Sequence, residues 1–312
     1  KLLDIINPTG QQIVVLSAVA GTTDRLVEIA GYCTNGNKNA AKACITKLCS
    51  VYGEFVSGLF TDTVWQKKAN AIINEVFTEL RSIVEGDFFE REEKIILSFG
   101  ELLSTQLYHT YLQSLGVESV LLSALDFVRT NDDGEPDIKF LSDKLGEILK
   151  AYPSTQLFIT QGFICRSSKG EIDNLKRGGS DYTASLIGAA VGAEEIQIWT
   201  DISGMHNNDP RIVKDTERVA CLSYEEAAEL AYFGAKILHP QCVFPARKFN
   251  IPLRLLNTMQ PDNEGTLITK NSERQKIKSI AAKDGITAIK VQSNRLLLTH
   301  SFLSRVFEVF HR

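Results

Sequence analysis

The feature that most constrains the fold of this chain is the alternation of short apolar strand patterns with helical patterns along most of its 312 residues. The strand signals are runs rich in β-branched and other apolar residues, and they lie at 13–16, 119–123, 156–160, 196–200 and 251–255. Between them, apolar residues recur at spacings of three and four, over 40–111, over 141–149 and from Ser223 onward. Strands separated by helices predict an α/β fold with a largely parallel sheet.

Composition excludes several classes of protein. The chain is 44% hydrophobic and 23% charged, which is typical of a globular protein and not of a disordered, collagen-like or coiled-coil chain. A net charge of −4 lacks the basic excess that nucleic acids and membrane surfaces favour. No apolar run reaches membrane-spanning length and the first residues include charges, so we expect a cytoplasmic protein. Six cysteines without a Cys-x-x-Cys pair indicate reduced, mostly buried thiols.

The two ends of the sequence indicate a fragment of a longer protein. There is no initiating Met, and residues 302–310 have helical apolar spacing without a following element. The polar segment 270–276 is the expected linker, which places a domain boundary near residue 272. Residues 285–291 and the terminal helix are expected to begin a second, incomplete unit.

The loops that follow the strands are where an α/β sheet binds ligands. Arg-Gly-Gly-Ser-Asp at 177–181 opens a small-residue helix, and its paired glycines would let the backbone approach an anion at the positive end of that helix. Arg177 could hold a carboxylate or a phosphate with two parallel hydrogen bonds. The same loop is equally typical of a glycine turn in which Ser180 or Asp181 caps the helix.

Three further positions have both a functional and a structural interpretation. Asp201 follows the 196–200 strand, where it could contact nucleotide phosphates or magnesium, or serve a turn. Lys236 could reach a phosphate or stabilise a helix C-terminus through the dipole. Glu101 lies three residues after Ser98 in the spacing of a capping box, so a capping role stays open for it.

Hydroxyl groups also follow the first strand. Ser17, Thr22 and Thr23 could bind substrate or end the strand. His239, which precedes Pro240, is expected to pack or cap a helix and not to act as an acid or base.

Taken together and in this order, these loops resemble one family, the aspartate kinases of the amino acid kinase superfamily. The resembling segments cover residues from about 13 to 268 and lie at 15–23, 100–104, 128–132, 159–163, 177–182, 198–201, 209–211 and 233–240. The resemblance implies a three-layer α/β/α sandwich with a mostly parallel central sheet over residues 1–272. It also implies transfer of the γ-phosphoryl group of ATP, with Mg2+, to the side-chain carboxylate of L-aspartate, the first step of lysine, threonine and methionine biosynthesis.

Matched position by position, the resemblance implies two groups of site residues. Arg177 would bind the α-carboxylate of aspartate and Glu101 its ammonium group, with Arg177 and Asp181 as the catalytic residues. The remaining substrate positions would be Ser17, Thr23, Ser180 and Asp181. The nucleotide positions would be Thr200, Asp201, His206, Arg211, Lys236 and Ile237, with the segment around His206 beside the adenine.

The chain departs from the family pattern at three places. The Lys-Phe-Gly-Gly-Thr-Ser motif of the family's first strand, which carries a catalytic lysine, does not occur, and we attribute this to a missing N-terminus. Lys176 stands where glycine is usual, and His206 stands where tyrosine is usual. Two alternatives remain open: a kinase for another amino acid such as glutamate, and a noncatalytic amino acid sensor on the same fold.

Residues 273–312 resemble a linker and the beginning of an ACT regulatory domain, an incomplete α+β unit. The resemblance implies a homodimer formed through the ACT region and feedback by an amino acid, lysine or threonine. From the charge balance and the lengths of the apolar runs, we expect no nucleic acid or membrane partner.

Overall fold

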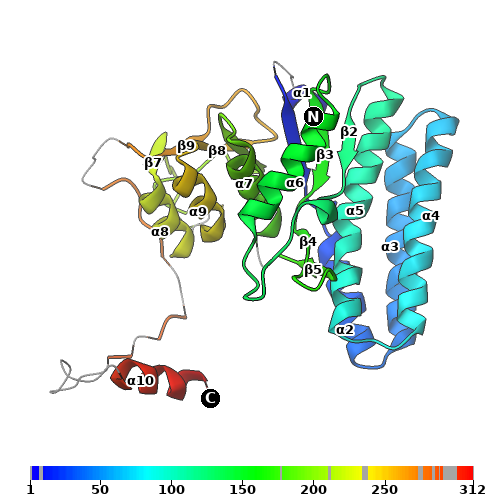
Figure 1. Ribbon diagram of the computed structural model, residues 1–312, viewed down its shortest axis with the longest axis horizontal. Helices are drawn as coiled ribbons and strands as arrows, with labels where there is room; N and C mark the ends of the chain where they lie inside the picture. Colours follow the sequence, from blue (N-terminus) through cyan, green and yellow to red (C-terminus); the bar gives the residue numbers. More distant parts are fainter. Residues whose placement is uncertain are drawn as a thin grey trace. The chain divides into compact units, whose positions relative to one another are not determined.

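The computed structural model describes residues 2–6, 10–175, 178–209, 212–233, 238–272, 277–282, 285–287, 289–290 and 301–311 (Figure 1). The strands are β1 (Gln12–Leu16), β2 (Val120–Leu122), β3 (Leu157–Gln161), β4 (Ile164–Arg166), β5 (Ile172–Asn174), β6 (Ile196–Thr200), β7 (Cys221–Ser223), β8 (Leu253–Asn257) and β9 (Thr266–Thr269). The helices are α1 (Leu2–Ile5), α2 (Thr22–Thr34), α3 (Lys38–Leu59), α4 (Thr63–Glu85), α5 (Glu90–Ser114), the 3-10 helix η1 (Ala124–Asp126), α6 (Ile138–Ala151), α7 (Gly179–Val191), α8 (Tyr224–Tyr232), α9 (Pro240–Phe249) and α10 (Ser301–His311). The chain divides into two compact units, residues 1–281 and 282–312.

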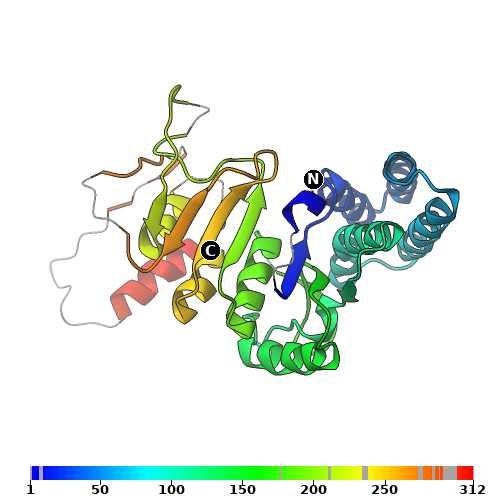
Figure 2. The ribbon, with the colours of Figure 1, turned by 90° about the horizontal axis from the view of Figure 1, so that it is seen from above.

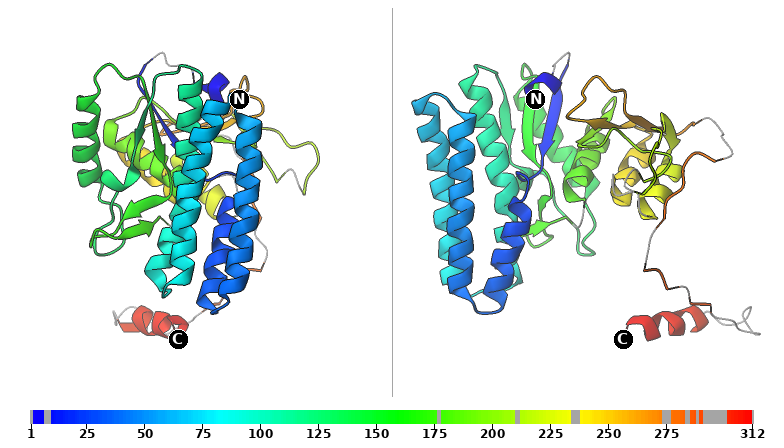
Figure 3. Two further views of the ribbon diagram at one scale, coloured as in Figure 1. Left: turned by 90° about the vertical axis from the view of Figure 1, so that its right-hand side faces the viewer. Right: turned by 180° about the vertical axis from the view of Figure 1, so that it is seen from behind.

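Helices α2 to α5 pack side by side as an elongated bundle in the first unit (Figure 3). Their starts are fixed locally: the Asn37 side chain accepts a hydrogen bond from Ala40 N at the start of α3, and Asp62 accepts one from Val64 N at the start of α4. The helices meet through a buried apolar core that includes Tyr52 and Phe77. This bundle is the helical region that the spacing over 40–111 predicts.

The first sheet, of order β1-β3-β2, is parallel throughout and lies between two helical layers. Alternate residues of β3 face opposite sides. Leu157 and Ile159 pack with Tyr108 of α5, whereas Phe158 packs with residues of α6 and α7 such as Leu145. The three-layer α/β/α arrangement is therefore present here.

The second sheet has the order β6-β8-β9-β7, and only the β8–β9 pair in it is antiparallel. Helix α8 lies beside β7 and β9 (Figure 2). Residues of α8 and α9 form one core with apolar residues of the strands. Helix α7 contacts β1 and β6, which are edge strands of the two sheets. The α/β class and the mostly parallel pairing are confirmed, and the strands are divided between these two sheets and the β4–β5 hairpin.

One local prediction is wrong. Ser98 does not begin a helix, because α5 starts at Glu90, where the Glu92 carboxylate accepts a hydrogen bond from Phe89 N at 3.1 Å. The Ser98 hydroxyl instead donates to Ile95 O inside the helix.

The predictions about the C-terminal region have separate outcomes. Helix α10 confirms the helical spacing of 302–310. The division between the units follows Ala281, later than the expected boundary near 272, and the assignment of 273–312 to a linker and an ACT unit stays a prediction.

All six cysteines are free, and four of them are buried. Within the described helices, none is both long and apolar enough to cross a bilayer.

Candidate active site

The loop after β1 is held against helix α5 by an exceptionally close approach. A Cβ on Gly100 would lie 2.8 Å from the Ala18 side chain, so only glycine permits this packing. The Ser104 hydroxyl donates to Ser17 O at 2.7 Å and fixes the same loop one turn further along α5. Glycine is tolerated inside the helix because it has no Cβ, and the loop and the helix can therefore approach each other closely.

Glu101 lies where α5 meets this loop, and its side chain is only 4% exposed. Its Oε1 accepts a hydrogen bond from Ala18 N at 3.2 Å. Its Oε2 is buried and has no hydrogen-bond partner within the described part of the chain. Burial raises the pKa of Glu101 to about 7, opposed by backbone hydrogen bonds that include the one from Ala18. Such a carboxylate has one oxygen left for a cationic group.

The other hydroxyls of the loop differ in their surroundings. Thr22 is buried, and its hydroxyl lies 2.9 Å from Tyr52 Oη in the helical bundle, which gives it a structural role. Ser17 and Thr23 are exposed, Ser17 directly after β1 and Thr23 in the first turn of α2. Both side chains are therefore accessible to a substrate.

The start of α7 lies against the end of β3. A Cβ on Gly162 would lie 2.5 Å from the Cβ and Oγ of Ser180, and Gly162 N donates to Leu16 O at 2.9 Å. The loop after β3 therefore joins the end of β1 to the first turn of α7. This juxtaposition brings Ser17, Glu101 and Ser180 to one region of the first unit.

Asp181 is the next residue of that turn, and it is half-buried. Burial raises the pKa of Asp181 to about 6. Its charge also adds to the burial that raises the pKa of the Cys242 thiol in α9. The interpretation of Ser180 or Asp181 as N-cap is wrong: the N-cap is Gly178, whose φ of 74° suits glycine, and both residues lie inside the helix. His239 does cap a helix, since its ring accepts a hydrogen bond from Gln241 N at the start of α9.

Thr200 and Asp201 lie at the end of β6, as the sequence predicts. The Thr200 hydroxyl accepts a hydrogen bond from Ile202 N at 3.0 Å, which closes a local turn, and Asp201 is exposed. His206 follows in the same loop, with its Nδ1 3.0 Å from the Thr216 hydroxyl. Thr200 is the last residue of β6, and Asp201 and His206 lie in the loop that follows it, residues 201–209.

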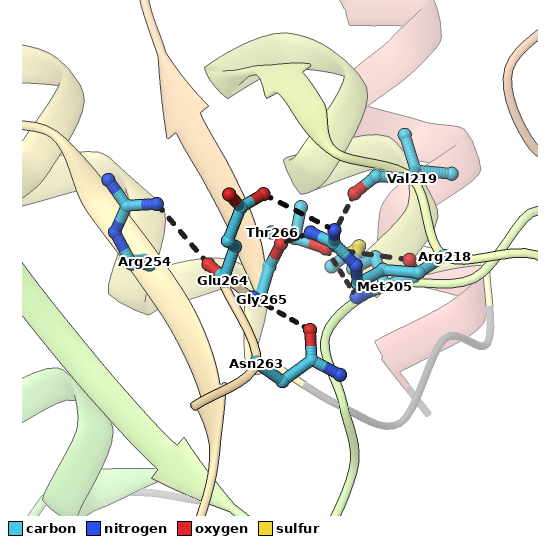
Figure 4. A network of polar contacts seen from close by, with 8 residues as sticks. All are labelled: Met205, Arg218, Val219, Arg254, Asn263, Glu264, Gly265 and Thr266. Atoms are coloured by element: carbon cyan, nitrogen blue, oxygen red, sulfur yellow. Dashed lines mark hydrogen bonds and ion pairs between the residues drawn. The ribbon is translucent and has the colours of Figure 1, made fainter. Parts of the chain in front are cut away.

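A buried threonine anchors the base of this loop (Figure 4). Thr266 of β9 accepts a hydrogen bond from Met205 N at 2.8 Å and donates one to Val219 O at 2.7 Å. Arg218 adds a hydrogen bond to Gly265 O and an ion pair with Glu264. The network joins residues that are about 50 to 60 positions apart in the sequence.

Four predicted site residues lie outside the described residues: Arg177, Arg211, Lys236 and Ile237. Their proposed roles stay predictions. Lys176, which stands where glycine is usual in the family, also lies outside the described residues.

The sequence interpretation gave no role to three buried polar residues that organise the site. Gln161, at the end of β3, accepts from Ala124 N and donates to the Thr105 hydroxyl. Asn257 ends β8 opposite Thr200 and donates to the Ser203 hydroxyl. Thr266 holds the base of the 201–209 loop. The available signal was a polar residue at one terminus of an apolar strand run, the last residue for Gln161 and Asn257 and the first for Thr266.

A cavity of about 410 Å³ lies between α2 and α3 and reaches the loop after β1 at Val19 and Ala20. Its lining includes Gly21 and Thr22 but neither Glu101 nor Asp181. Among the described residues, no group of three or more His, Cys, Asp or Glu side chains is placed to hold a metal ion. Glu101 and Asp181 lie instead beside the loops after β1 and β3.

Comparison with known proteins gives a consistent result. Residues 1–257 match the amino acid kinase family. The chain is 34% identical to aspartokinase 1, chloroplastic, of Arabidopsis thaliana, over 97% of this chain and 55% of that protein. It is 31% identical to lysine-sensitive aspartokinase 3 of Escherichia coli, over 99% of this chain and 69% of that protein. The chain thus spans little more than half the length of the plant relative.

The fold is also similar to a solved structure. The crystal structure of Escherichia coli aspartokinase III in complex with aspartate and ADP matches with a TM-score of 0.69 and 32% identity, covering 84% of this chain and 58% of that one.

Proposed function

Because the chain belongs to the amino acid kinase family, and within it to the aspartokinases, we propose that the protein transfers the γ-phosphoryl group of ATP to the side-chain carboxylate of L-aspartate. A carboxylate oxygen of aspartate attacks the γ-phosphorus, the bond to the β,γ-bridging oxygen breaks, and 4-phospho-L-aspartate and ADP result. This chemistry requires mainly positioning and charge compensation from the protein.

The observation that carries the proposal is the environment of Glu101. A carboxylate that is 4% exposed, with one oxygen bonded to Ala18 N and the other without a partner in the described residues, suits the ammonium group of an amino acid. An ammonium ion there would supply the missing hydrogen bond and the opposite charge together. The exposed hydroxyl of Ser17 and the first turn of α7 with Ser180 lie in the same region.

The remaining roles follow from the family. Arg177 holds the α-carboxylate of aspartate, and Thr23 and Asp181 complete the substrate site. The partial positive charge at the start of α7, where the backbone N–H groups are not satisfied within the helix, favours an anionic group. Asp181 in that first turn, with a pKa raised to about 6, is in position to exchange a proton near neutral pH or to bind a cation.

The nucleotide site consists of the end of β6 and the 201–209 loop, with Thr200, Asp201 and His206, joined by Arg211, Lys236 and Ile237. The ADP-bound relative supports nucleotide binding. Magnesium enters this proposal as part of the MgATP substrate. Mg2+ is commonly bound by one or two carboxylates together with phosphate oxygens, and Asp201 and Asp181 are carboxylates that could complete such a set.

For the full-length protein we propose a cytoplasmic homodimer formed through an ACT region, with lysine or threonine as a feedback effector. The name of the lysine-sensitive relative, which the chain matches over 99% of its own length, favours lysine.

The test is formation of an acyl phosphate, trapped with hydroxylamine, from MgATP and either L-aspartate or L-glutamate, using the full-length natural protein. We expect product that depends on aspartate. Greater turnover of glutamate would indicate a kinase for that amino acid, and amino acid binding without product would indicate a noncatalytic sensor. A Glu101→Gln variant, assayed in parallel, should form less aspartate-dependent product, because it lacks the charge that is proposed to bind the ammonium group.

A further inference from the structure

The residues just before the second unit are bonded to the 201–209 loop. Ile280 N donates to Asn207 O at 2.9 Å, and the Ser279 hydroxyl donates to His206 O at 2.8 Å. Two consecutive carbonyl groups of the loop thus have partners in the segment 277–280. These contacts join positions more than seventy residues apart, and neither belongs to a helix or a sheet.

Lys278 anchors the same segment to the start of α8. Its ammonium group lies 3.0 Å from Glu226 Oε2 and donates to the Ser272 hydroxyl at 2.8 Å. The Lys278 side chain is only 7% exposed, so this ion pair is shielded from solvent on the lysine side. The same Glu226 oxygen accepts Ser223 N at 2.7 Å as part of the capping box of α8. The segment is therefore attached to a fixed point of the fold.

The 201–209 loop is consequently held at two levels. Thr266 fixes its base through Met205 N, and the segment 277–280 fixes the next two residues, His206 and Asn207, through their carbonyls. Asn207 also accepts a hydrogen bond from Glu217 N on its side chain, so the loop is paired to the 212–219 stretch as well. Without the segment 277–280, the carbonyls of His206 and Asn207 would lose these partners.

We propose that the segment 277–280, anchored by Lys278, positions the 201–209 loop for nucleotide binding. Lys278 and Ser279 are positioning residues, because they act through the loop backbone. The inference rests on the proposed nucleotide site. It predicts that damage to the segment weakens binding of ATP and leaves binding of the amino acid substrate unchanged, since the loop after β1 and Glu101 make no contact with it in the described residues.

The experiment compares MgATP affinity, measured by calorimetry on the full-length protein, for the wild type and four variants. Lys278→Met removes the anchor, and Ser279→Ala removes one hydrogen bond to the loop. Ser279→Thr keeps the hydroxyl and should restore binding. Lys270→Met, at an exposed lysine outside the segment, is the matched control. We expect Ser279→Ala to weaken MgATP binding about threefold to tenfold, as for the loss of one hydrogen bond. Lys278→Met should weaken it by about tenfold or more, and Lys270→Met should leave it unchanged.

The Michaelis constants separate positioning from general destabilisation. Under the proposal, Lys278→Met and Ser279→Ala raise the KM for ATP and leave the KM for aspartate unchanged. An equal rise of the KM for ATP and the KM for aspartate would show that the segment has only a structural role. A lower unfolding temperature with unchanged MgATP affinity would show the same. MgATP binding is measured without aspartate. The comparison of the variants therefore tests the positioning role of the segment even if the protein does not phosphorylate aspartate. A wild type that does not bind MgATP would overturn the inference together with the nucleotide site.

Discussion

Replacing Glu101 by Gln tests the central residue of the proposed site. Glu101 is 4% exposed, bonded to Ala18 N through one oxygen, and its pKa is raised by burial to about 7 from an ordinary value of 4.5. Glutamine has nearly the same shape and can keep the bond from Ala18 N, but it carries no charge at any pH. The variant therefore isolates the effect of ionising this group.

The sign of the stability effect follows from the two pKa values. The unfolded chain releases the Glu101 proton near pH 4.5, whereas the folded protein keeps it until about pH 7. The folded state is therefore penalised progressively as the pH rises from about 4.5 to 7. At about 1.36 kcal/mol per pH unit, the full penalty is on the order of 3 kcal/mol, of which about 2 kcal/mol develops between pH 5.5 and pH 8.

Urea unfolding at pH 5.5 and pH 8 measures this penalty directly. We expect the free energy of unfolding of Glu101→Gln, relative to the wild type, to rise by about 2 kcal/mol between the two pH values. Calorimetric titration with L-aspartate measures the binding role: the wild-type affinity should rise by up to about thirtyfold over the same range, because only the ionised carboxylate attracts the ammonium group. The affinity of Glu101→Gln should be lower at pH 8 and vary less with pH. Identical pH profiles for the two proteins would refute the assignment of Glu101 to the ammonium group.

Three further substitutions have defined outcomes. Arg177→Ala should weaken L-aspartate binding much more than MgATP binding in calorimetry, because its proposed partner is the substrate α-carboxylate, and equal losses would contradict that role. Gly162→Ala should cost about 1–3 kcal/mol in urea unfolding and raise the KM for aspartate, since the new Cβ would lie 2.5 Å from Ser180, whereas the control Gly146→Ala meets no atom within 4 Å and should not destabilise. Thr266→Val should cost about 1–3 kcal/mol and weaken MgATP binding, because Met205 N and Val219 O lose their partner; unchanged MgATP affinity would show that the base of the loop is irrelevant to the nucleotide.

The positions of β1, β2, β3, β6 and β8 were predictable because each is a short apolar run followed by a polar or small residue, whereas β4, β5, β7 and β9, of three or four residues each, were not predicted. Thr200 and Asp201 lie at the end of β6 as expected, and Ser17 directly follows β1. Parallel pairing then brings the ends of β1 and β3 to the same edge of their sheet. The positions of residues that directly follow a strand were therefore predictable from the order of strands and helices in the sequence.

Local rules failed where a tertiary contact overrides them. Ser98 and Glu101 have the spacing of a capping box, but the run of helix-forming residues from Glu90 continues through them. Gly100, which would weaken an isolated helix, is retained because it allows α5 to approach Ala18. The role of Thr266 depends in the same way on residues about 50 to 60 positions distant. No pattern within a short window contains such contacts.

The burial of Glu101 and Asp181 is the part of the site that could be found only in the structure, and it points to function most directly. Burial raises the pKa of both carboxyl groups, so each makes the folded state less stable as the pH rises towards neutrality, from 4.5 to about 7 for Glu101 and from 3.8 to about 6 for Asp181. The effect of Asp181 is the smaller one because this residue is only half-buried. Packing alone would be better served at Glu101 by an apolar side chain of similar volume. The stability of the first unit must come from elsewhere, chiefly from the apolar cores of the α2–α5 bundle and of the layers around β3. Two destabilising carboxyl groups, on helices that pack against the loops after β1 and β3, are consistent with a site that becomes favourable only when a cationic ligand group is bound.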